Sequence, residues 1–445
     1  MTVYSQLNHT HDPSARSWVE SAQSADCDFP IQNLPWCVQR SELGLQVGVR
    51  IGTQHLAVAP LATAGLLAGF EPALFEGPYL SEALLSLSPE RRGALREALF
   101  ALLSSEASAE LQAQVSAHLS PIGELTLPIK IGDYTDFYAS VHHATNVGMM
   151  FRPTNPLLPN YKWLPVGYHG RASSVVVSGT PVKRPSGQKA PTEEGGTPGF
   201  GPCALLDYEL EVGAVVGRGT ALGEPLDIEE AGERLFGLCL LNDWSARDIQ
   251  KWEYQPLGPF LAKNFLSSVS PYVVTAEALA PFRAPAPARA EGDPAPLPHL
   301  YSERDQAEGC FDVTLQVHLS TEAMRAQGLP AHQLSEGSFK EMYWTVAQML
   351  THHSASGCNL QPGDLLGSGT VSGPERSQRG CLLELTWDGG VGNPLPTTSR
   401  SPITLPSGEE RRFLLAGDEL SLSGRCHAEG ARSIGFGSCI GRVLD

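Results

Sequence analysis

The chain has 445 residues, of which 42% are hydrophobic, and its 31 Lys and Arg against 48 Asp and Glu give a formal net charge of -17. A chain of this length can bury a large core and is expected to form two or more domains. Its basic residues form no continuous stripe, and we therefore expect no nucleic-acid partner.

The N-terminus and the cysteines indicate the compartment. The N-terminus lacks a basic segment followed by an apolar one, and no apolar run is long enough to cross a bilayer, so we expect no membrane partner and a cytoplasmic location. The 9 Cys are scattered without a C-x-x-C pair. This spacing argues against a disulfide framework and against a thiolate zinc site.

The first part of the chain predicts a small β unit. Residues 1–33 are polar and are expected to form a loosely structured lead-in. Apolar and polar residues alternate across residues 38–59, which is the pattern of strands separated by glycine turns.

Helices are expected after these strands. Ser88 can cap a helix that begins at Pro89, and a second helix is expected over residues 107–119. We place a boundary near Ser120, which divides the chain into residues 1–120, a β domain with helices, and residues 121–445.

The remainder is rich in strand patterns and is punctuated by Pro and Gly, so we expect a mainly β, α+β protein. Surface loops are predicted at residues 186–202, 280–298 and 388–407. A helix is predicted from Phe339 to His353, because apolar residues recur on one side of it.

A polar stretch over residues 132–148 contains a first group of candidate site residues, namely Asp136, Tyr138, His142 and His143. Aspartate can hold a hard metal ion, and histidine can move protons near neutral pH. The spacing indicates a site where a metal and an activated water meet. The alternative is a polar turn with an N-capping Asp and solvent-facing histidines.

Acidic and apolar residues alternate over residues 205–212. On a strand, Glu209 and Glu211 point to the same face, because side chains repeat every second residue. Two such carboxylates are tolerated in a pocket when a cation lies between them. The alternative is a strand face exposed to solvent.

A third polar group follows an apolar strand that ends at Asp243. Ser245 can cap a short helix, and Arg247, Gln250 and Tyr254 then share one helix face. An Arg, a Gln and a Tyr on one face can hold carboxylate and carbonyl groups. An ordinary amphipathic helix with its polar residues outward is the alternative.

Three more residues have unusual sequence surroundings. Lys263 lies in an apolar stretch, where a lysine either extends to water or serves a site as its cation. Thr370 lies in a Gly-Ser-Thr loop that lets a substrate approach the backbone. Glu384 lies inside an apolar segment that we predict to be a strand, and a buried Glu there needs a partner such as a histidine.

The acidic residues can all serve as oxygen ligands of one metal ion. Four carboxylates offer oxygen donors: Asp136, Glu209, Glu211 and Asp243. Hard oxygen ligands select Mg²⁺ or Ca²⁺ and not Zn²⁺. Their excess negative charge is offset if Lys263 and Arg247 lie nearby.

Longer motifs resemble a known family. They are Asp-Tyr-Thr-Asp-Phe-Tyr at 133–138, His-Ala-Thr-Asn-Val-Gly at 143–148, Leu-Pro-Val-Gly-Tyr-His-Gly-Arg-Ala-Ser-Ser at 164–174, Asn-Asp-Trp-Ser-Ala-Arg-Asp-Ile-Gln at 242–250, Pro-Leu-Gly-Pro-Phe-Leu at 256–261, Met-Tyr-Trp-Thr at 342–345 and Thr-His-His-Ser at 351–354. These motifs are specific, and together with a final stretch at 435–439 they cover nearly the whole chain. The sequence resembles the fumarylacetoacetase family.

The resemblance implies a fold and an activity. It implies a small SH3-like N-terminal β-barrel domain, a large mixed β-roll catalytic domain and a homodimer. It also implies metal-dependent hydrolysis of a carbon–carbon bond in a small diketo acid, 4-fumarylacetoacetate, which is the last step of tyrosine and phenylalanine breakdown.

The resemblance also implies residue roles. The matched metal ligands are Asp136, Glu209, Glu211 and Asp243, with Lys263 and Ser267 at a second cation-related position. The matched catalytic residues are His143, Glu384, Arg247, Gln250 and Lys263. The matched substrate contacts are Tyr138, Arg152, Gln250, Tyr254 and Thr370.

The sequence departs from the family pattern at two positions, and two alternative functions are considered. Ser267 stands where the family usually has Thr, and it keeps a hydroxyl. His142 stands beside His143, and we choose His143 as the base because it directly precedes the Ala-Thr-Asn-Val-Gly motif. The rivals are a related acylpyruvate hydrolase and a non-catalytic protein that binds metal and acid.

Overall fold

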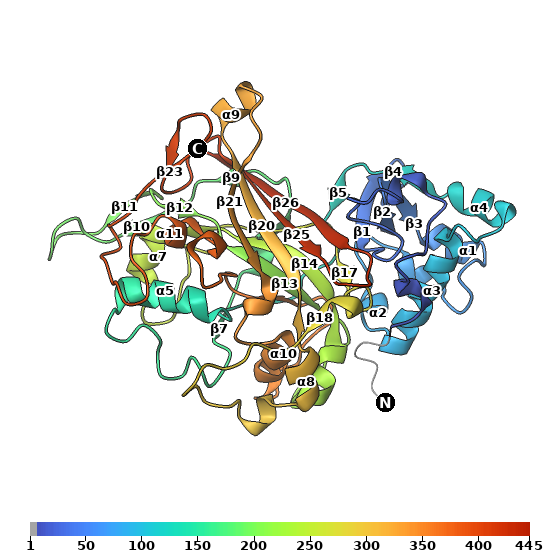
Figure 1. Cartoon of the computed structure of the whole chain (residues 1–445), viewed down its shortest axis with the longest axis horizontal. Helices are drawn as coiled ribbons and strands as arrows, with labels where there is room; N and C mark the ends of the chain where they lie inside the picture. Colours follow the sequence, from blue (N-terminus) through green and yellow to red (C-terminus); the bar gives the residue numbers. More distant parts are fainter. Residues whose placement is uncertain (1–6) are drawn as a thin grey trace.

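The computed structural model describes residues 7–445, and within this range strands supply most of the framework (Figure 1). The mainly β, α+β class predicted from the sequence is confirmed. In Figure 1 the N-terminal part, drawn in blue, lies to one side of a larger assembly of sheets. No helix within residues 7–445 is long and apolar enough to cross a membrane.

The N-terminal part is built on a five-stranded antiparallel sheet. Its strands, in spatial order, are β4 (Leu119–Pro121), β3 (Gln54–Ala57), β2 (Gly44–Ile51), β1 (Trp36–Ser41) and β5 (Leu125–Thr126). The helices of this part are α1 (Ala59–Thr63), α2 (Glu82–Leu85), α3 (Pro89–Leu103) and α4 (Ala109–Ser116). The predicted start of α3 is confirmed, since the Ser88 hydroxyl accepts a hydrogen bond from the Arg91 backbone N–H.

The prediction of a loosely structured lead-in is wrong for residues 7–33, and residues 1–6 lie outside the described range. The buried guanidinium of Arg96 in α3 donates hydrogen bonds to the hydroxyl and the carbonyl of Thr10, and to the carbonyls of Gln32 and Asn33. Polar composition misled the prediction, because these backbone carbonyls are satisfied by an arginine that lies some 60 to 90 positions later in the chain.

An eight-stranded mixed sheet forms the centre of the larger part. Its strands are β7 (Gly167–His169), β6 (Tyr134–Phe137), β22 (Leu365–Gly367), β13 (Leu210–Val216), β14 (Leu235–Asp243), β16 (Ser267–Val269) and β8 (Val175–Val177) in this order, with β17 (Val274–Thr275) also paired to β14. The predicted strand that ends at Asp243 is β14. Strands from distant parts of the sequence therefore lie side by side, and their polar ends are brought together.

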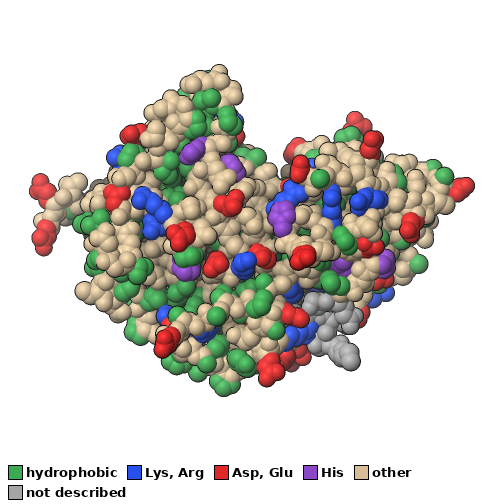
Figure 2. Space-filling view, viewed as in Figure 1, with side chains coloured by type: hydrophobic (Ala, Val, Ile, Leu, Met, Phe, Trp, Pro, Cys, Tyr) green, Lys and Arg blue, Asp and Glu red, His purple; other side chains and the backbone are tan. Residues whose placement is uncertain are grey.

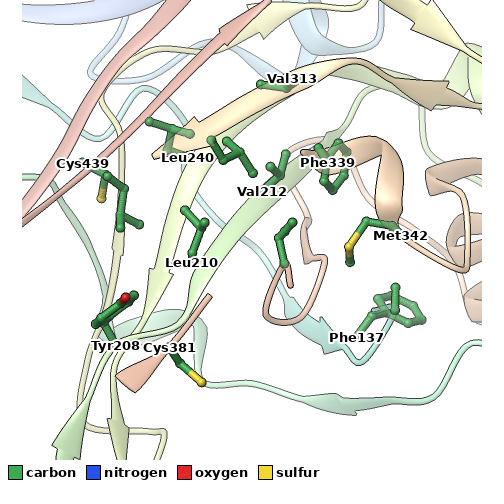
Figure 3. Packing of buried hydrophobic residues seen from close by; sticks show 14 of the residues in the cluster. Phe137, Tyr208, Leu210, Val212, Leu240, Val313, Phe339, Met342, Cys381 and Cys439 are labelled. Atoms are coloured by element: carbon green, nitrogen blue, oxygen red, sulfur yellow. The ribbon is translucent and has the colours of Figure 1, made fainter. Parts of the chain in front are cut away.

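A second, five-stranded sheet packs against the first. Its strands are β21 (His332–Ser338), β20 (Val313–Ser320), β25 (Glu419–Cys426), β26 (Ile434–Leu444) and β9 (Val182–Lys183). Between the sheets lies a continuous apolar core, to which Leu210, Val212 and Leu240 contribute (Figure 3). In this core Leu240 of β14 approaches Gly424 of β25. A side chain at Gly424 would place its Cβ 3.0 Å from Leu240, so the close packing of the sheets depends on this glycine.

Short strand pairs and helices complete the larger part. The pairs are β10 (Ser186–Lys189) with β11 (Gly199–Pro202), β12 (Leu206–Asp207) with β15 (Ser245–Ala246), β18 (Arg283–Ala284) with β19 (Cys310–Phe311), and β23 (Ile403–Thr404) with β24 (Glu410–Arg411). The helices are α5 (Val141–Phe151), α6 (Ile228–Ala231), α7 (Arg247–Glu253), α8 (Glu303–Glu308), α9 (Glu322–Ala326), α10 (Val346–Ser354) and α11 (Leu382–Leu385). The loop predicted at residues 186–202 therefore contains a hairpin.

The helix predicted from Phe339 to His353 is also wrong in its first part. A short 3₁₀ turn covers Phe339–Glu341, and α10 begins only after Thr345, whose hydroxyl accepts from the Gln348 N–H while the Gln348 side chain accepts from the Thr345 N–H. This capping box starts a new helix. Periodicity alone joined two elements that the cap separates.

Acidic and basic side chains are interspersed on the molecular face drawn in Figure 2. Long helices are absent from the described range, in which α3 and α5, of 15 and 11 residues, are the longest α-helices.

We predict that Arg96→Met destabilises the protein by about 3 kcal/mol or more, because it leaves several buried carbonyls without donors at a cost of about 1–3 kcal/mol each. The free energy of unfolding is measured by urea denaturation. The control is Arg40→Met, since Arg40 and its partner Glu124 are both largely exposed and such a surface pair contributes about 0–1 kcal/mol. Equal stability of the two variants would contradict the anchoring role of Arg96.

Candidate functional site

Four acidic side chains meet where β6, β13 and β14 lie close together. They are Asp136 on β6, Glu209 just before β13, Glu211 on β13 and Asp243 at the end of β14. One carboxylate oxygen of each lies within 4.8 Å of one oxygen of every other, and all four residues are buried. The structure therefore brings together all four carboxylates that the sequence singles out.

Two basic side chains face this cluster. Lys263 Nζ lies 2.5 Å from Asp243 Oδ2 and 2.8 Å from Glu209 Oε2. Arg247 Nη1 lies 2.5 Å from Glu209 Oε1, and its Nε lies 2.9 Å from Asp207 Oδ2. Lys263 thus serves the site as a buried cation and does not extend to water.

The positive charges are distributed unevenly over the acids. Burial would raise the pKa of Glu209, but Lys263 and Arg247 outweigh it and hold this pKa well below its usual value. Burial, together with the neighbouring acids, raises the pKa of Asp136 and of Glu211 well above their usual values. Asp136 and Glu211 are therefore the two carboxyl groups whose ionised form is least compensated by positive charge within the chain.

Those two side chains also have oxygens without partners. Asp136 Oδ1 and Glu211 Oε1 are buried and accept no hydrogen bond from any residue in the range 7–445. Gly367 on β22 leaves room beside them, since a Cβ there would lie 2.9 Å from Glu211 Oε2 and 3.2 Å from Asp136 Oδ1. Unpaired buried carboxylate oxygens in an all-oxygen donor set fit a hard divalent cation.

Asp243 is held in place by its neighbours. The Ser267 hydroxyl donates to its Oδ1 at 2.9 Å, and the Tyr168 hydroxyl donates to its Oδ2 at 3.2 Å. Ser267 therefore reaches the cluster through Asp243. The cap predicted at Ser245 is wrong, because Ser245 lies in β15 and its hydroxyl bonds to Glu209 Oε1 at 3.1 Å instead of starting α7.

A histidine–carboxylate pair lies beside this cluster. His143 Nδ1 on α5 is 2.6 Å from Glu384 Oε2, and both side chains are buried. Asn146 Nδ2 and the Ser372 hydroxyl also donate to Glu384, each at 2.8 Å. His142 is only half-buried, and no hydrogen bond from it to Glu384 is present among the described residues.

The environment of Glu384 decides the protonation of this pair. Burial alone would raise its pKa, but His143 and the hydrogen bonds from His143, Asn146 and Ser372 lower it to about 2. An ionised carboxylate only accepts hydrogen bonds, so His143 Nδ1 carries the hydrogen and Nε2 is the basic nitrogen of the ring.

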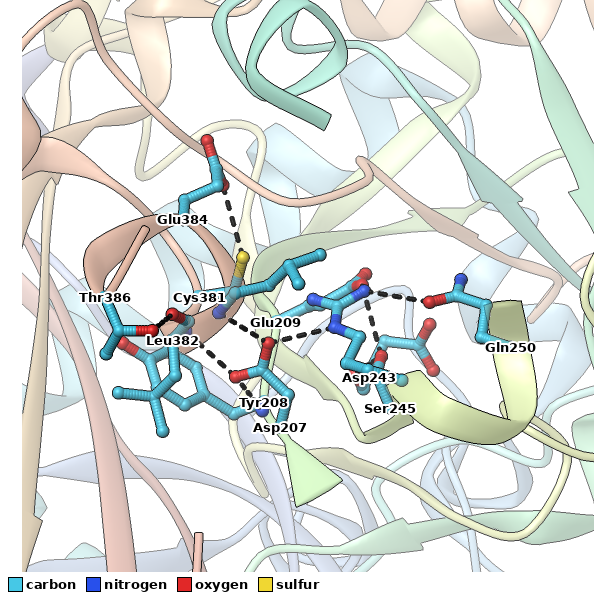
Figure 4. A network of polar contacts seen from close by, with 12 residues as sticks. Asp207, Tyr208, Glu209, Asp243, Ser245, Gln250, Cys381, Leu382, Glu384 and Thr386 are labelled. Atoms are coloured by element: carbon cyan, nitrogen blue, oxygen red, sulfur yellow. Dashed lines mark hydrogen bonds and ion pairs between the residues drawn. The ribbon is translucent and has the colours of Figure 1, made fainter. Parts of the chain in front are cut away.

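The strand predicted around Glu384 is wrong. Residues Leu382–Leu385 form the one-turn helix α11. A short run of buried apolar residues is compatible with a strand or a helix, and its periodicity does not separate the two. Tertiary contacts at both ends of α11 make the difference, and Figure 4 shows some of them.

A cavity of about 990 Å³ adjoins both groups. The predicted residues that line it are Asp136, Tyr138, His143, Arg152, Glu209, Arg247, Gln250, Tyr254, Lys263 and Thr370. Glu211, Asp243, Ser267 and Glu384 do not line it. Glu211, Asp243 and Glu384 lie next to lining residues, and Ser267 contacts Asp243. The predicted face of Arg247, Gln250 and Tyr254 thus points into this cavity.

Polar groups on the cavity wall are available to a bound molecule. Thr370 Oγ1, Arg247 Nη2 and Arg152 Nε are buried and have no hydrogen-bond partner within the described chain. The Tyr138 ring stands edge-on to the His143 ring at a centroid distance of 5.3 Å. This arrangement can hold an anionic, oxygen-rich small molecule against the imidazole.

Sequence reasoning missed several residues of this site. Asp207, Asn146, Tyr161 and Tyr168 contact predicted residues directly. Two signals could have found the first two: Asp207 continues the alternation of Glu209 and Glu211, and Asn146 follows His143 by three residues on one helix face. The two tyrosines carry no such signal.

A sequence model described as Fumarylacetoacetate (FAA) hydrolase C-terminal matches residues 133–444. A protein named fumarylacetoacetase from Bos taurus is 47% identical over 429 residues, which cover 94% of this chain and 97% of that protein. One of the same name from Dictyostelium discoideum is 46% identical over 440 residues, with coverage of 96% and 98%.

A solved structure gives a weaker resemblance. The fumarylacetoacetate hydrolase from Exiguobacterium antarcticum shares 16% sequence identity and a TM-score of 0.48, and the match covers 92% of this chain and 99% of that chain.

We predict that Asp136→Asn raises the melting temperature of the chelator-treated protein, because it removes one charge from a buried group of like charges. The same change should reduce the rise in melting temperature that Mg²⁺ or Ca²⁺ produces, because one anionic ligand is lost. Both quantities are measured by thermal denaturation with and without the ion.

The control for this prediction is Asp26→Asn, which changes the same charge at an exposed position and should leave both quantities unchanged. If Asp136→Asn leaves the ion-dependent rise intact, the four-carboxylate cluster is not a cation site.

Proposed function

This chain belongs to the fumarylacetoacetate hydrolase family, and we propose that it hydrolyses 4-fumarylacetoacetate to fumarate and acetoacetate, the last step of tyrosine and phenylalanine catabolism. The extent of similarity to proteins named fumarylacetoacetase, over nearly the whole of each chain, supports this substrate. The single structural observation that carries the proposal is the buried His143–Glu384 pair beside the four-carboxylate cluster, both at one cavity.

We propose that His143 is the general base. Its Nε2 takes a proton from a water molecule, and the resulting hydroxide attacks a carbonyl carbon of the substrate, so that an O–C bond forms. Glu384 fixes the ring through Nδ1 and stabilises the imidazolium that results. The carbon–carbon bond next to the attacked carbonyl then breaks, and its electron pair goes to the leaving enolate, which takes up a proton to become acetoacetate.

Three residues are proposed to stabilise the oxyanion. Arg247, Gln250 and Lys263 line the cavity, and Arg247 Nη1 holds the Gln250 side-chain oxygen at 3.1 Å. That bond points the donor nitrogen of Gln250 away from Arg247. Fixed donors in a site shielded from water stabilise developing negative charge more strongly than water does.

Substrate contacts are proposed for Tyr138, Arg152, Gln250, Tyr254 and Thr370. The substrate carries a carboxylate at each end, and the cavity offers hydroxyls and guanidinium groups that match these anions. Because the protein carries a formal net charge of -17, these local cations are required for a dianion to bind.

A divalent metal is proposed as the cofactor, either Mg²⁺ or Ca²⁺. Asp136, Glu209, Glu211 and Asp243 would hold it, with Lys263 and Ser267 beside Asp243. When bound, such an ion supplies Lewis-acid polarisation of the carbonyl oxygens of the substrate.

Assembly and compartment belong to the same proposal. A homodimer is supported by large apolar side chains exposed near α7, among them Trp252, Leu257, Phe260 and Leu261. A cytoplasmic location is supported by the nine cysteines, which are all free thiols.

We also propose the division into residues 1–120 and 121–445. The apolar cluster between the two large sheets contains only residues beyond 120, which supports the division. The cluster around the N-terminal sheet also includes residues of the large sheet, such as Val215, Leu241 and Leu365, so the two parts pack against each other. β5 at Leu125–Thr126 pairs with β1 and adds a strand from beyond residue 120 to the N-terminal sheet.

We predict that His143→Ala lowers kcat for hydrolysis of 4-fumarylacetoacetate by about a hundredfold or more, because the general base is lost. Release of fumarate and acetoacetate is measured at saturating substrate. His142→Ala is the matched control and should retain kcat within about threefold, because His142 makes no bond to Glu384. Comparable turnover by wild type and His143→Ala would refute the assignment of the base.

We predict that removal of divalent ions with EDTA abolishes hydrolysis and that added Mg²⁺ or Ca²⁺ restores it, because the carbonyl would lose its Lewis acid. Bound metal is quantified in each sample by elemental analysis. Full activity in protein shown to be free of metal would exclude the proposed cofactor. Metal-loaded protein that leaves this substrate intact would exclude the proposed function.

A further inference from the structure

The short helix that carries Glu384 needs contacts with other parts of the chain to be stable. α11 is a single turn, Leu382–Leu385, and an isolated turn of helix is unstable because nucleation costs more than one turn of hydrogen bonds returns. The position of Glu384, and with it the His143 ring, must therefore be set by groups outside the helix.

Asp207 holds the N-terminal end of this turn. Its Oδ1 accepts from the Leu382 N–H and its Oδ2 from the Leu383 N–H, each at 2.9 Å. The Tyr208 N–H donates to Oδ1 at the same distance. A carboxylate that takes up the unpaired N–H groups at a helix start both satisfies them and favours the helix electrostatically.

Arginines hold the C-terminal end. Arg400 Nη1 donates to the Leu383 carbonyl at 2.6 Å, Arg379 Nη1 to the Glu384 carbonyl at 2.7 Å and Arg376 Nε to the Leu385 carbonyl at 2.9 Å. Carbonyls at a helix C-terminus lack intrahelical partners, and here only the Glu384 carbonyl among these three also accepts a backbone N–H in the described chain, that of Trp387 at 3.3 Å. Both ends of α11 are thus held by charged side chains.

Asp207 also contacts the opposite side of the site. Its Oδ2 accepts from Arg247 Nε at 2.9 Å, and Arg247 in turn reaches Glu209 and Gln250 (Figure 4). Asp207 is fully buried and does not line the cavity. The Asp207 carboxylate therefore connects the helix that bears Glu384 to Arg247, which lies beside the four-carboxylate cluster.

We propose that Asp207 is a positioning residue for hydrolysis: it fixes Glu384, and through it His143, in register with Arg247. The inference rests on the proposed function of the His143–Glu384 pair. Asp207 touches neither the cavity nor a reacting atom, so its effect on turnover passes through those neighbours.

Asp207→Asn tests this role, because the amide is isosteric but has only one acceptor oxygen. Its NH₂ group must face either the Tyr208 and Leu382 N–H groups or the Leu383 N–H and Arg247, so two of the four bonds are lost. Small displacements of catalytic groups lower turnover steeply, and we expect kcat to fall by about tenfold to a hundredfold, with a smaller change in KM.

A double-mutant cycle separates positioning from general destabilisation. Asp207→Asn lowers kcat by some factor in the wild type and by another factor in a Glu384→Ala background. If Asp207 acts through Glu384, the second factor should be smaller than the first by about fivefold or more, because coupled residues have non-additive effects. A structural role alone would give the same factor in both backgrounds. Equal factors, or a folded Asp207→Asn enzyme with kcat within about threefold of wild type, would overturn the inference.

A second readout does not need the substrate. The His143 Nδ1 hydrogen in its 2.6 Å bond to Glu384 should give a far-downfield proton NMR signal that disappears in His143→Ala. We expect Asp207→Asn to shift or broaden that signal. An unchanged signal in Asp207→Asn would overturn the inference, whether or not the substrate assignment is correct. A shifted signal in Asp207→Asn, together with no hydrolysis by the wild type, would refute the proposed function and leave the positioning role of Asp207 intact.

Two further variants complete the design. Asp305→Asn is the control, since Asp305 is a buried Asp that accepts bonds from Thr345 away from the cavity, and it should leave kcat and the signal unchanged. If Asp207→Asn fails to fold, Arg379→Gln removes a bond at the other end of α11, and the same cycle with Glu384→Ala applies with the same criteria.

Discussion

Repulsion among four buried carboxylates is the constraint around which the rest of the site is arranged. Two unit charges within 4.8 Å of each other repel by about 3.5 kcal/mol or more at an effective dielectric constant of about 20, and the cluster contains several such pairs. Lys263 and Arg247 neutralise the side occupied by Glu209 and Asp243. The remaining side has unpaired oxygens on Asp136 and Glu211, and these oxygens are available to a metal ion.

The fold keeps these mutually repelling carboxylates together by placing their strands in one sheet. Strands β6, β22, β13 and β14 lie side by side in one sheet, and this sheet places carboxylates from three distant segments within 4.8 Å of one another. Gly367 supplies the space that the carboxylates need. The apolar core between the two sheets then fixes the strands, so the charges cannot relax by moving apart.

Charged groups also fix the side of the cavity at which His143 and Glu384 lie. Glu384 is kept ionised by His143, Asn146 and Ser372, and its helix is held at both ends by Asp207 and three arginines. Asp207 and Arg247 connect this region with the carboxylate cluster. An acidic protein thus builds a cationic, polar cavity by committing its buried acids to structural partners, which leaves guanidinium groups and hydroxyls for an anionic substrate.

The sequence by itself determined the elements whose signals are local. The cap at Ser88, the strand that ends at Asp243 and the mainly β class follow from turn chemistry and periodicity. Alternation placed Glu209 and Glu211 on one side of the chain, and chemical type indicated a hard-metal site. The family motifs indicated which imidazole to choose, a choice that spacing alone left open.

Only the tertiary structure decided the rest, and the physical reason is distance along the chain. Glu384 meets His143 across 241 residues, and Asp207 caps α11 across 175 residues, so no local pattern contains either contact. The segment around Glu384 is a helix because of those distant partners, although its apolar composition suits a strand equally well. Arg96 holds Thr10, Gln32 and Asn33 across a similar distance along the chain, and this contact is likewise absent from any local pattern.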